Sequence, residues 1–253
     1  MRMDIVQSFY DHLASQYDQL FLDWEAATHE QAVILNRIIA DCGFDNSAHI
    51  LDCACGIGTQ SIGLASLGYP VTGSDISSGA LAEAKERAAQ KNVRIRFEQA
   101  DFRKLSSVFS EQFDIVIAMD NALPHMLTSE ALDSAVGSIV GQLRTGGLFI
   151  ASIRDYDSLL ETKPPYAPPY IHRTERGQRV SFQTWTWSGD SYRLIQYIIA
   201  DEDTLQISRF ECEYRAARRD ELTDLLLKNG CSEVRWMFPQ ETGFYQPIVT
   251  ARK

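Results

Sequence analysis

The stretch His49-Ile-Leu-Asp-Cys-Ala-Cys-Gly-Ile-Gly-Thr-Gln60 decides the fold of this chain. An apolar strand leads into a turn built on Gly56 and Gly58, and a helix follows at once. Glycines at such a turn let a ligand approach the backbone closely, because no Cβ stands in the way. Asp75 ends the next strand, about 20 residues on, where the ribose hydroxyls of a nucleoside can be held. Together these features predict a nucleoside-containing cofactor at the carboxyl ends of parallel strands.

The third position of the glycine motif separates the two cofactor families that use this geometry. Dinucleotide dehydrogenases follow the pattern G-x-G-x-x-G, with the pyrophosphate on the helix N-terminus. Here the third position is Ser61. The run Asp52-x-Ala54-x-Gly56-x-Gly58 instead resembles the first motif of class I S-adenosylmethionine (SAM) methyltransferases, with Ala54 in place of the usual first glycine. A dehydrogenase and a purely structural glycine turn remain open alternatives at this point.

The composition restricts the partners and the compartment. The chain has 253 residues, which suits one domain with an insertion, and it carries a net charge of -10 with a pI near 5.0. Nucleic acids and anionic membranes are disfavoured as partners, because phosphate neutralisation needs clustered Lys and Arg. We find no apolar run as long as a membrane span and no signal peptide. The sequence predicts a cytoplasmic protein with a small-molecule substrate, either a monomer or a homodimer.

The cysteines predict neither a disulfide scaffold nor a metal site. Their count of five is odd, and cytosol fits this best. Cys53 and Cys55 lie on one face of a strand, a spacing that can indicate metal or redox chemistry. No further Cys or His pattern follows them, so we expect small buried thiols beside the glycine turn.

Alternating strands and helices predict a parallel, doubly wound sheet. Apolar residues at helical spacing indicate two helices within the first 40 residues. Strands are expected at 49–54, 70–75, 93–99, 113–119 and 147–153, with helices near 59–67, 78–91, 129–144 and, less regularly, 102–108. A helix over 219–228 and two strands over 233–238 and 246–251 complete the chain.

The sequence pattern changes after Ser152. The prolines within residues 164–169 are expected to break regular structure. Three β-rich runs follow, at 179–187, 192–200 and 205–214, and residues 188–190 and 201–203 suit hairpin turns between them. The segment after the fifth strand is therefore predicted to be an antiparallel β insertion.

Three further segments resemble glycine and sarcosine N-methyltransferases. They are Tyr17-Asp18-Gln19-Leu20-Phe21-Leu22-Asp23-Trp24, Asp120-Asn121-Ala122-Leu123-Pro124-His125-Met126 and Ile153-Arg154-Asp155-Tyr156-Asp157-Ser158-Leu159-Leu160. The resemblance implies an α/β fold, the doubly wound class I methyltransferase (Rossmann-like) seven-stranded sheet, whose last strand inserts antiparallel. The family's lid arginine, which binds the methionine carboxylate of SAM, has no match within residues 25–28.

The resemblance also divides the chain into two parts. Residues 1–154 and 216–253 form the expected SAM-binding methyltransferase domain, with a helical lid over residues 1–40. Residues 155–215 form the expected antiparallel β insertion for acceptor recognition.

The resemblance places SAM across the carboxyl ends of the strands. Asp75 accepts hydrogen bonds from both ribose hydroxyls, unless it only caps the helix that begins near Ser78. Asp101 accepts from the adenine amine. At the lid, aromatic residues can cover the sulfonium, whose charge attracts aromatic faces. The expected cofactor-binding residues are Tyr17, Trp24, Asp52, Ala54, Gly56, Gly58, Asp75, Ile76, Asp101, Phe102 and Asp120.

Asn121, His125 and Arg154 are the candidate catalytic residues. Asn121 is placed to hold a polar acceptor, and His125 is either a base or a packing residue. The guanidinium of Arg154 suits a carboxylate on the acceptor, unless it pairs with Asp155 or Asp157. The expected acceptor-binding residues are Asn121, Arg154, Trp185, Trp187, Tyr197 and Tyr245, although the aromatic residues of the insertion can instead serve packing alone.

The resemblance implies a SAM-dependent methyltransferase that methylates the amine of glycine, sarcosine or a similar amino acid. The reaction is direct displacement, so the protein mainly orients and desolvates the reactants, and it needs no strong base. Two alternatives remain open. One is a methyltransferase for another small hydroxyl or amine, and the other is a SAM-binding regulatory protein without turnover.

Overall fold

A seven-stranded sheet forms the centre of the protein. The structure is a computed structural model that describes residues 5–174, 177–200 and 206–253. The strand order is β10-β11-β5-β4-β1-β2-β3; neighbours among β1 to β5 pair in parallel, whereas β11 is antiparallel to both β5 and β10. The strands are β1 (Ile50–Asp52), β2 (Val71–Asp75), β3 (Arg96–Gln99), β4 (Phe113–Ala118), β5 (Leu143–Ser152), β10 (Ser232–Met237) and β11 (Ile248–Arg252). The predicted sheet with its inserted antiparallel last strand is confirmed.

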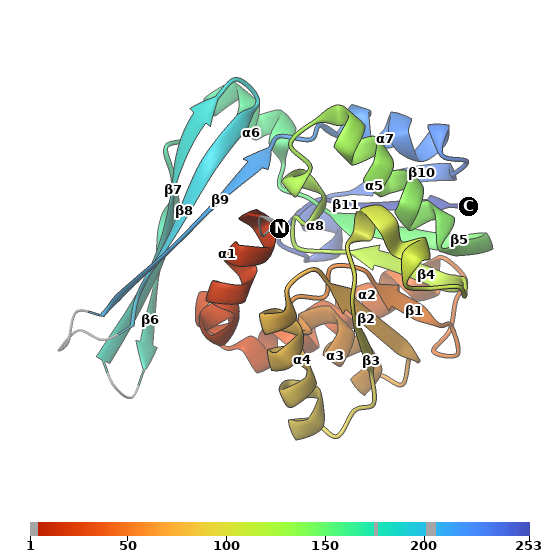
Figure 1. Cartoon of the computed structure of the whole chain (residues 1–253), viewed down its shortest axis with the longest axis horizontal. Coiled ribbons are helices and arrows are strands. Elements are labelled where there is room, and N and C mark those ends of the chain that lie inside the picture. Colours follow the sequence, from red (N-terminus) through yellow and green to blue (C-terminus); the bar gives the residue numbers. More distant parts are fainter. Residues whose placement is uncertain (1–4, 175–176, 201–205) are drawn as a thin grey trace.

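Helices cover both faces of this sheet (Figure 1). They are α2 (Trp24–Asp41), α3 (Thr59–Ser66), α4 (Ser78–Gln90), α5 (Ser129–Gly141), α7 (Arg219–Lys228) and α8 (Pro239–Thr242), with the 3-10 segments η2 (Phe102–Ser107) and η3 (Leu123–His125). Strand β4 shows why both faces are apolar. Ile115 and Ile117 pack in the cluster that contains residues of α2, whereas Val116 and Ala118 pack in the cluster that contains residues of α5 and α7. Successive side chains of a strand point to opposite faces, so a strand covered twice is apolar throughout.

A second sheet follows β5 in the chain and projects to one side of the molecule (Figure 1). It is antiparallel and has the order β6-β7-β8-β9. After α6 (Tyr156–Thr162) come β6 (Tyr166–Thr174), β7 (Gly177–Ser188), β8 (Ser191–Ile199) and β9 (Ile207–Arg215). Gly189 adopts a φ of 63° between β7 and β8, which confirms the first predicted turn. The second predicted turn, at 201–203, lies outside the described residues.

The prediction that prolines break the structure over 164–169 is wrong from Tyr166 onward. Strand β6 begins there and includes Pro168 and Pro169. The strand pairs only with β7, and its register shifts between Ala167 and Tyr170. Proline lacks the N–H that a sheet ladder requires, and an edge strand with a bulge tolerates that loss.

The N-terminal segment lies between the two sheets (Figure 1). It comprises α1 (Ile5–Leu13) and η1 (Ala14–Leu20), and α1 contacts both β9 and α4. Asp11 fixes this segment, because its Oδ1 accepts from Ser77 Oγ at 2.6 Å and from Gly79 N at 2.9 Å. Within the described ranges, no helix has the length and apolar character needed to cross a bilayer.

Candidate active site

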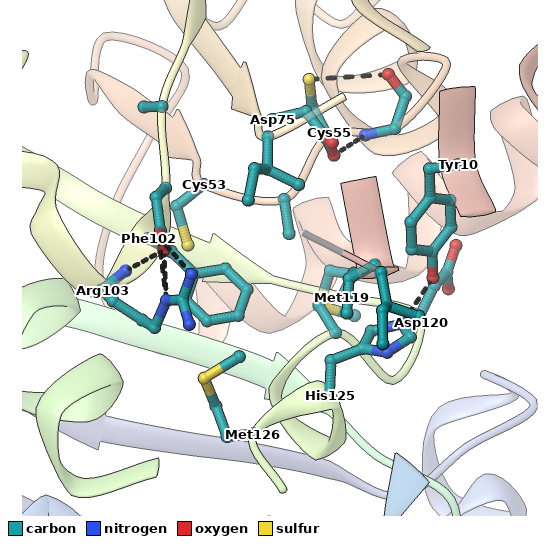
Figure 2. Close-up of a pocket in the computed structure, with 18 of the residues that line it drawn as sticks. Tyr10, Cys53, Cys55, Asp75, Phe102, Arg103, Met119, Asp120, His125 and Met126 are labelled. Atoms are coloured by element: carbon teal, nitrogen blue, oxygen red, sulfur yellow. Dashed lines mark hydrogen bonds and ion pairs between the residues drawn. The ribbon is translucent and has the colours of Figure 1, made fainter. Parts of the chain in front are cut away.

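A cavity of about 490 Å³ opens at the carboxyl ends of β1, β2, β3 and β4 (Figure 2). The N-terminal segment contributes Tyr10 and Tyr17 to its wall, so the predicted lid borders the cavity. Nine of the predicted site residues line it: Tyr17, Ala54, Gly56, Asp75, Ile76, Asp101, Phe102, Asp120 and His125. Cys53 and Cys55 are buried in the same wall, as predicted, and the described residues contain no group of His, Cys, Asp and Glu that could hold a metal ion.

The two glycines of the turn have different structural roles. Gly56 has a φ of 53°, and a Cβ added there would meet no atom within 4 Å. Gly56 therefore leaves open space at the cavity wall, which is what close approach of a ligand requires. Gly58 has a φ of 92°, and a Cβ there would lie 2.8 Å from Ile62 Cδ1. Gly58 is thus required for packing of the turn on α3, and it does not line the cavity.

Asp75 is held by backbone N–H groups at the tip of β2. Its Oδ2 accepts from Gly56 N at 2.8 Å, and its Oδ1 accepts from Ser77 N at 2.9 Å. The alternative that Asp75 caps α4 is wrong, because Ser77 is the cap and accepts from Ala80 N. Burial raises the pKa of Asp75, although the hydrogen bonds from Ser77 and Gly56 oppose that rise. A carboxylate has about four acceptor positions, so two remain for a pair of hydroxyl groups.

The end of the cavity next to β2 and β3 is formed by residues that follow these two strands. Ile76 and Phe102 provide apolar surface there. Asp101 accepts from Arg103 Nε at 2.8 Å and Nη2 at 2.6 Å. Burial opposes ionisation of Asp101, but the hydrogen bonds and charge of Arg103 hold its pKa below the usual value. Figure 2 shows Phe102 and Arg103 on one side of the cavity and Asp120 and His125 on another.

Two predicted cofactor residues lie behind the cavity wall. The Trp24 indole is buried and donates to Thr59 Oγ1 at 3.0 Å, and Thr59 lines the cavity. Asp52 is fully buried and accepts from Ser61 Oγ at 2.7 Å. Burial raises the pKa of Asp52 to about 7, against the hydrogen bonds from Ser61 and the backbone of Ala54. Both residues support the glycine turn and α3 from behind.

The turn after β4 has an unusual backbone. Asp120 and Asn121 have φ values of 55° and 68°, in the left-handed region that non-glycine residues seldom adopt. Ser152 holds the turn, because Asp120 N donates to its Oγ at 2.8 Å and Asn121 N donates to its backbone oxygen at 3.0 Å. Asn121 Oδ1 in turn accepts from Arg154 N at 3.0 Å. The ends of β4 and β5 are therefore locked together where the methyl acceptor is predicted to bind.

His125 joins the lid to the second sheet. Its Nε2 lies 2.9 Å from Tyr10 Oη, and its Nδ1 lies 3.3 Å from the backbone oxygen of Glu213. The imidazole also packs on Tyr214, with ring centroids 4.2 Å apart. With both nitrogens engaged, this geometry favours the packing interpretation of His125 over that of a base.

Arg154 lies in a cage of aromatic rings and neutral polar groups. Its Nη1 donates to Tyr192 Oη, and its Nη2 donates to Gln183 Oε1 at 3.1 Å. The guanidinium carbon lies 5.0 Å from the ring centre of Trp185 and 5.2 Å from that of Tyr214. Among the described residues, no carboxylate forms an ion pair with it.

The alternative that Arg154 pairs with Asp155 or Asp157 is wrong. Arg219 Nη1 pairs with Asp155 Oδ1, and it lies 3.3 Å from Asp157 Oδ2. Arg154 is therefore left without a countercharge of its own within the described residues, and it does not line the cavity directly.

The aromatic residues of the second sheet are divided between its two ends. Trp185 and Trp187 contact each other with ring centroids 6.3 Å apart, so they share a face as predicted, and both pack on Tyr192. Tyr197 instead stacks on Phe182, with a centroid distance of 4.9 Å. Trp185 thus belongs to the Arg154 cage, whereas Tyr197 packs on Phe182 at the other end of the sheet. Tyr245 lies before β11 and donates to Asp120 Oδ1 at 2.7 Å.

Comparison with known proteins identifies the domain. Residues 50–147 match the family model described as a methyltransferase domain. The chain has the fold of class I methyltransferases. It is 30% identical over 155 residues to the glycine/sarcosine N-methyltransferase of Parasynechococcus marenigrum, covering 61% of this chain and 54% of that protein. It is 31% identical over 180 residues to the glycine N-methyltransferase of Rattus norvegicus, covering 65% of this chain and 59% of that protein.

The fold of this methyltransferase domain extends to solved structures. The SAM-bound amino pentose methyltransferase CalS10 from Micromonospora echinaspora superposes with a TM-score of 0.74 at 19% identity, covering 89% of this chain and 91% of that one. The prediction of the fold is confirmed, and the match of residues 50–147 to a methyltransferase-domain model agrees with the predicted family. The alignments span little more than half the length of the two curated relatives.

Sequence reasoning missed several residues of the methyltransferase site. No motif marks three polar residues, namely Gln60, Arg103 and Gln183. Their partners lie far away in the chain or within an irregular turn. No motif marks Tyr10 either, although its hydroxyl lies 2.9 Å from His125 Nε2. In each case the functional signal is a tertiary contact.

Proposed function

We propose that this protein is a SAM-dependent methyltransferase that methylates the amine of a small amino acid such as glycine or sarcosine. The observation that carries the acceptor assignment is Arg154, a cation without a carboxylate partner among the described residues, beside the turn of Asn121. A buried or partly buried charge is costly when unpaired. A carboxylate on the acceptor would supply the missing partner. The names of the curated relatives agree with this assignment.

The residues of the cavity suit SAM. The open space at Gly56 and the two remaining acceptor positions of Asp75 fit a ribose held against the glycine turn. Ile76 and Phe102 would pack on the adenine, and Asp101 would accept from its amine. When bound, SAM supplies an activated methyl group, so the protein contributes binding and orientation.

The acceptor would be positioned from the opposite side. Arg154 offers two parallel donors to a carboxylate, and this fork fixes its orientation. Asn121 uses its Oδ1 for Arg154 N, so its amide nitrogen is the group that would bind the acceptor. A neutral amine needs no strong base for displacement, which agrees with the engaged nitrogens of His125.

We further propose that residues 155–215 form the acceptor-recognition part and that residues 1–154 and 216–253 bind the cofactor. The insertion supplies Gln183, Trp185 and Tyr192 to the Arg154 cage. Of its described residues, only Glu213 lines the proposed cofactor cavity. The two functions are therefore assigned to different segments of the chain.

A methyl-transfer screen with labelled SAM tests the proposal. The panel contains glycine, sarcosine, other amino acids, amino sugars and small phenols. Label transferred to glycine or sarcosine supports the proposal. Transfer only to acceptors without a carboxylate would replace it with the alternative of another small amine or hydroxyl. SAM binding without transfer to any acceptor would favour the regulatory alternative.

A further inference from the structure

The carboxylate of Asp120 has no cationic partner within the described part of the chain. It lines the cavity at the end of β4 and is partly buried. Its hydrogen-bond donors are Gln60 Nε2 at 2.8 Å and Tyr245 Oη at 2.7 Å, and both are neutral. Asp101, at the other end of the cavity, is neutralised by Arg103. The cavity thus contains one fixed, unneutralised carboxylate at its β4 end.

A second hydrogen bond fixes the orientation of Gln60. Its Nε2 also donates to Gln31 Oε1 at 2.6 Å, so both hydrogens of the amide nitrogen are used. The nitrogen, and not the oxygen, must therefore face Asp120. Gln31 and Gln60 are both buried. This network from α2 and α3 holds Asp120 as a hydrogen-bond acceptor in a single position.

The strand order indicates which part of the cofactor faces Asp120. Neighbouring strands run β4-β1-β2-β3. Under the proposed function, the ribose lies at Asp75 after β2 and the adenine lies at Asp101 after β3. The remaining part of the cofactor must then extend over β1 and β4, toward Asp120. That part carries the sulfonium and the amino-acid group.

We propose, on the basis of the proposed function, that Asp120 is a specificity-determining residue whose carboxylate provides the countercharge of the sulfonium. SAM carries this positive charge, whereas the demethylated product S-adenosylhomocysteine (SAH) has a neutral sulfur. A fixed carboxylate therefore favours SAM over SAH, and it favours release of the product after transfer. Three other carboxylates line the cavity: Asp75 is assigned to the ribose, Asp101 pairs with Arg103, and Glu213 is exposed on β9.

Calorimetric titration of Asp120→Asn with four nucleosides tests this inference. The nucleosides are SAM, SAH, sinefungin and 5′-methylthioadenosine. Sinefungin has an ammonium in place of the methyl sulfonium, and methylthioadenosine lacks both the sulfonium and the amino-acid group. We expect the Kd of SAM and sinefungin to rise about tenfold or more, the scale of one lost charge interaction in a partly buried site. The Kd of SAH and of methylthioadenosine should change less than about threefold.

Equal weakening of SAM and SAH would overturn the inference, because the carboxylate would then act on the amino group that both ligands share. Unchanged SAM affinity would overturn it as well. Failure of the unaltered protein to bind either SAM or SAH would instead refute the proposed function. The two failures are therefore distinguishable.

Two further variants serve as controls. Asp101→Asn removes a carboxylate that is already ion-paired, so it should weaken SAM and SAH by the same factor. Tyr245→Phe keeps the Asp120 carboxylate but removes one of its donors, so the SAM-to-SAH preference should fall by a smaller factor. If Asp120→Asn does not fold, as judged by its thermal transition, Tyr245→Phe carries the test, and an unchanged preference in that variant overturns the inference.

Discussion

The cofactor side and the acceptor side of this protein hold their charges in opposite ways. Around the cavity, Asp75 and Asp120 are carboxylates fixed by neutral donors, namely backbone N–H groups, an amide and a phenol. In the second sheet, Arg154 is a cation fixed by a phenol, an amide and aromatic rings. None of these three charged residues forms an ion pair with another described residue. Each side therefore retains a charge for a ligand of the opposite sign.

Other charges in the same chain behave differently, including one pair in the cavity wall. Arg219 next to Asp155, and Arg103 next to Asp101, are satisfied within the protein. The unpaired charges at the ends of β2, β4 and β5 thus distinguish the site from these ion-paired positions. The comparison predicts that removing a charge on either side affects one ligand and spares the other.

Arg154→Ala should have the largest effect. Losing a charge partner that is largely desolvated costs several kcal/mol, so kcat/KM for an amino-acid acceptor should fall about a hundredfold or more. KM should rise more than kcat falls, because the carboxylate is bound in both ground and transition states. Lysine should rescue poorly, since it lacks the planar fork. Steady-state kinetics measures this, with calorimetry to show that SAM affinity is retained.

Arg219→Ala is the matched control for that variant. It removes a neighbouring arginine whose partners Asp155 and Asp157 belong to the protein itself. Thermal stability should fall while the acceptor KM stays the same. If Arg154→Ala behaves like Arg219→Ala, the assignment of an amino-acid acceptor is refuted, whereas the assignment of the fold is unaffected.

Asp75→Asn should affect only the cofactor. A hydrogen bond from a hydroxyl to a charged group contributes about 1.5–3 kcal/mol, so the Kd for SAM should rise roughly tenfold to a hundredfold. Ser77→Ala removes the adjacent cap of α4 and tests for a purely structural effect. Calorimetry giving the same SAM affinity for Asp75→Asn as for the unaltered, folded protein would contradict the ribose assignment.

The raised pKa of Asp52 predicts how the stability of the protein depends on pH. Its pKa is raised from 3.8 to about 7 by burial, so the folded state holds the proton more tightly than the unfolded state. The stabilising contribution of the protonated group is complete below about pH 4 and is lost as the pH rises to about 7. We expect the free energy of unfolding of the unaltered protein to fall over this window relative to that of Asp52→Asn. Urea titrations at several pH values, without SAM, measure the difference; parallel curves for both proteins would refute the assignment.

Trp187→Phe should have the smallest effect. The substitution keeps an aromatic ring beside Trp185 but removes the hydrogen bond from the indole nitrogen to Pro164 O, at 2.9 Å. One neutral hydrogen bond contributes about 0.5–1.5 kcal/mol to stability, so any rise of the acceptor KM should stay below about tenfold. SAM affinity should not change. A folded variant with weakened SAM binding would show that the two sides are not independent.

The sequence sufficed for the central sheet because its signals are local. Glycines in a turn, alternating apolar strands and an acid at a strand tip are all readable within about 30 residues. Gly56, Asp75 and Asp101, which the sequence predicts to bind the cofactor, line one cavity. The side chains of Trp24 and Asp52, also predicted to bind it, support the wall from behind.

The second sheet and the acceptor side depend on contacts that sequence spacing does not reveal. Strand β6 was missed because proline is a strong local signal for a loop, whereas its position at a sheet edge is a tertiary fact. Arg154 has two acidic neighbours in sequence, but a residue from α7 takes them. A local pattern gives the available partners, and packing decides which of them are used.

Tyr245 and Gln246 give the site a particular order of assembly during synthesis. Tyr245 donates to Asp120 across 125 positions of the chain, and Gln246 accepts from Ser152 Oγ, which holds the same turn. A chain emerging from the ribosome presents the glycine turn early, but the turn after β4 gains these partners only when residues 245 and 246 have left the exit tunnel. The nascent protein thus has the Asp75 end of its pocket long before the Asp120 end is complete.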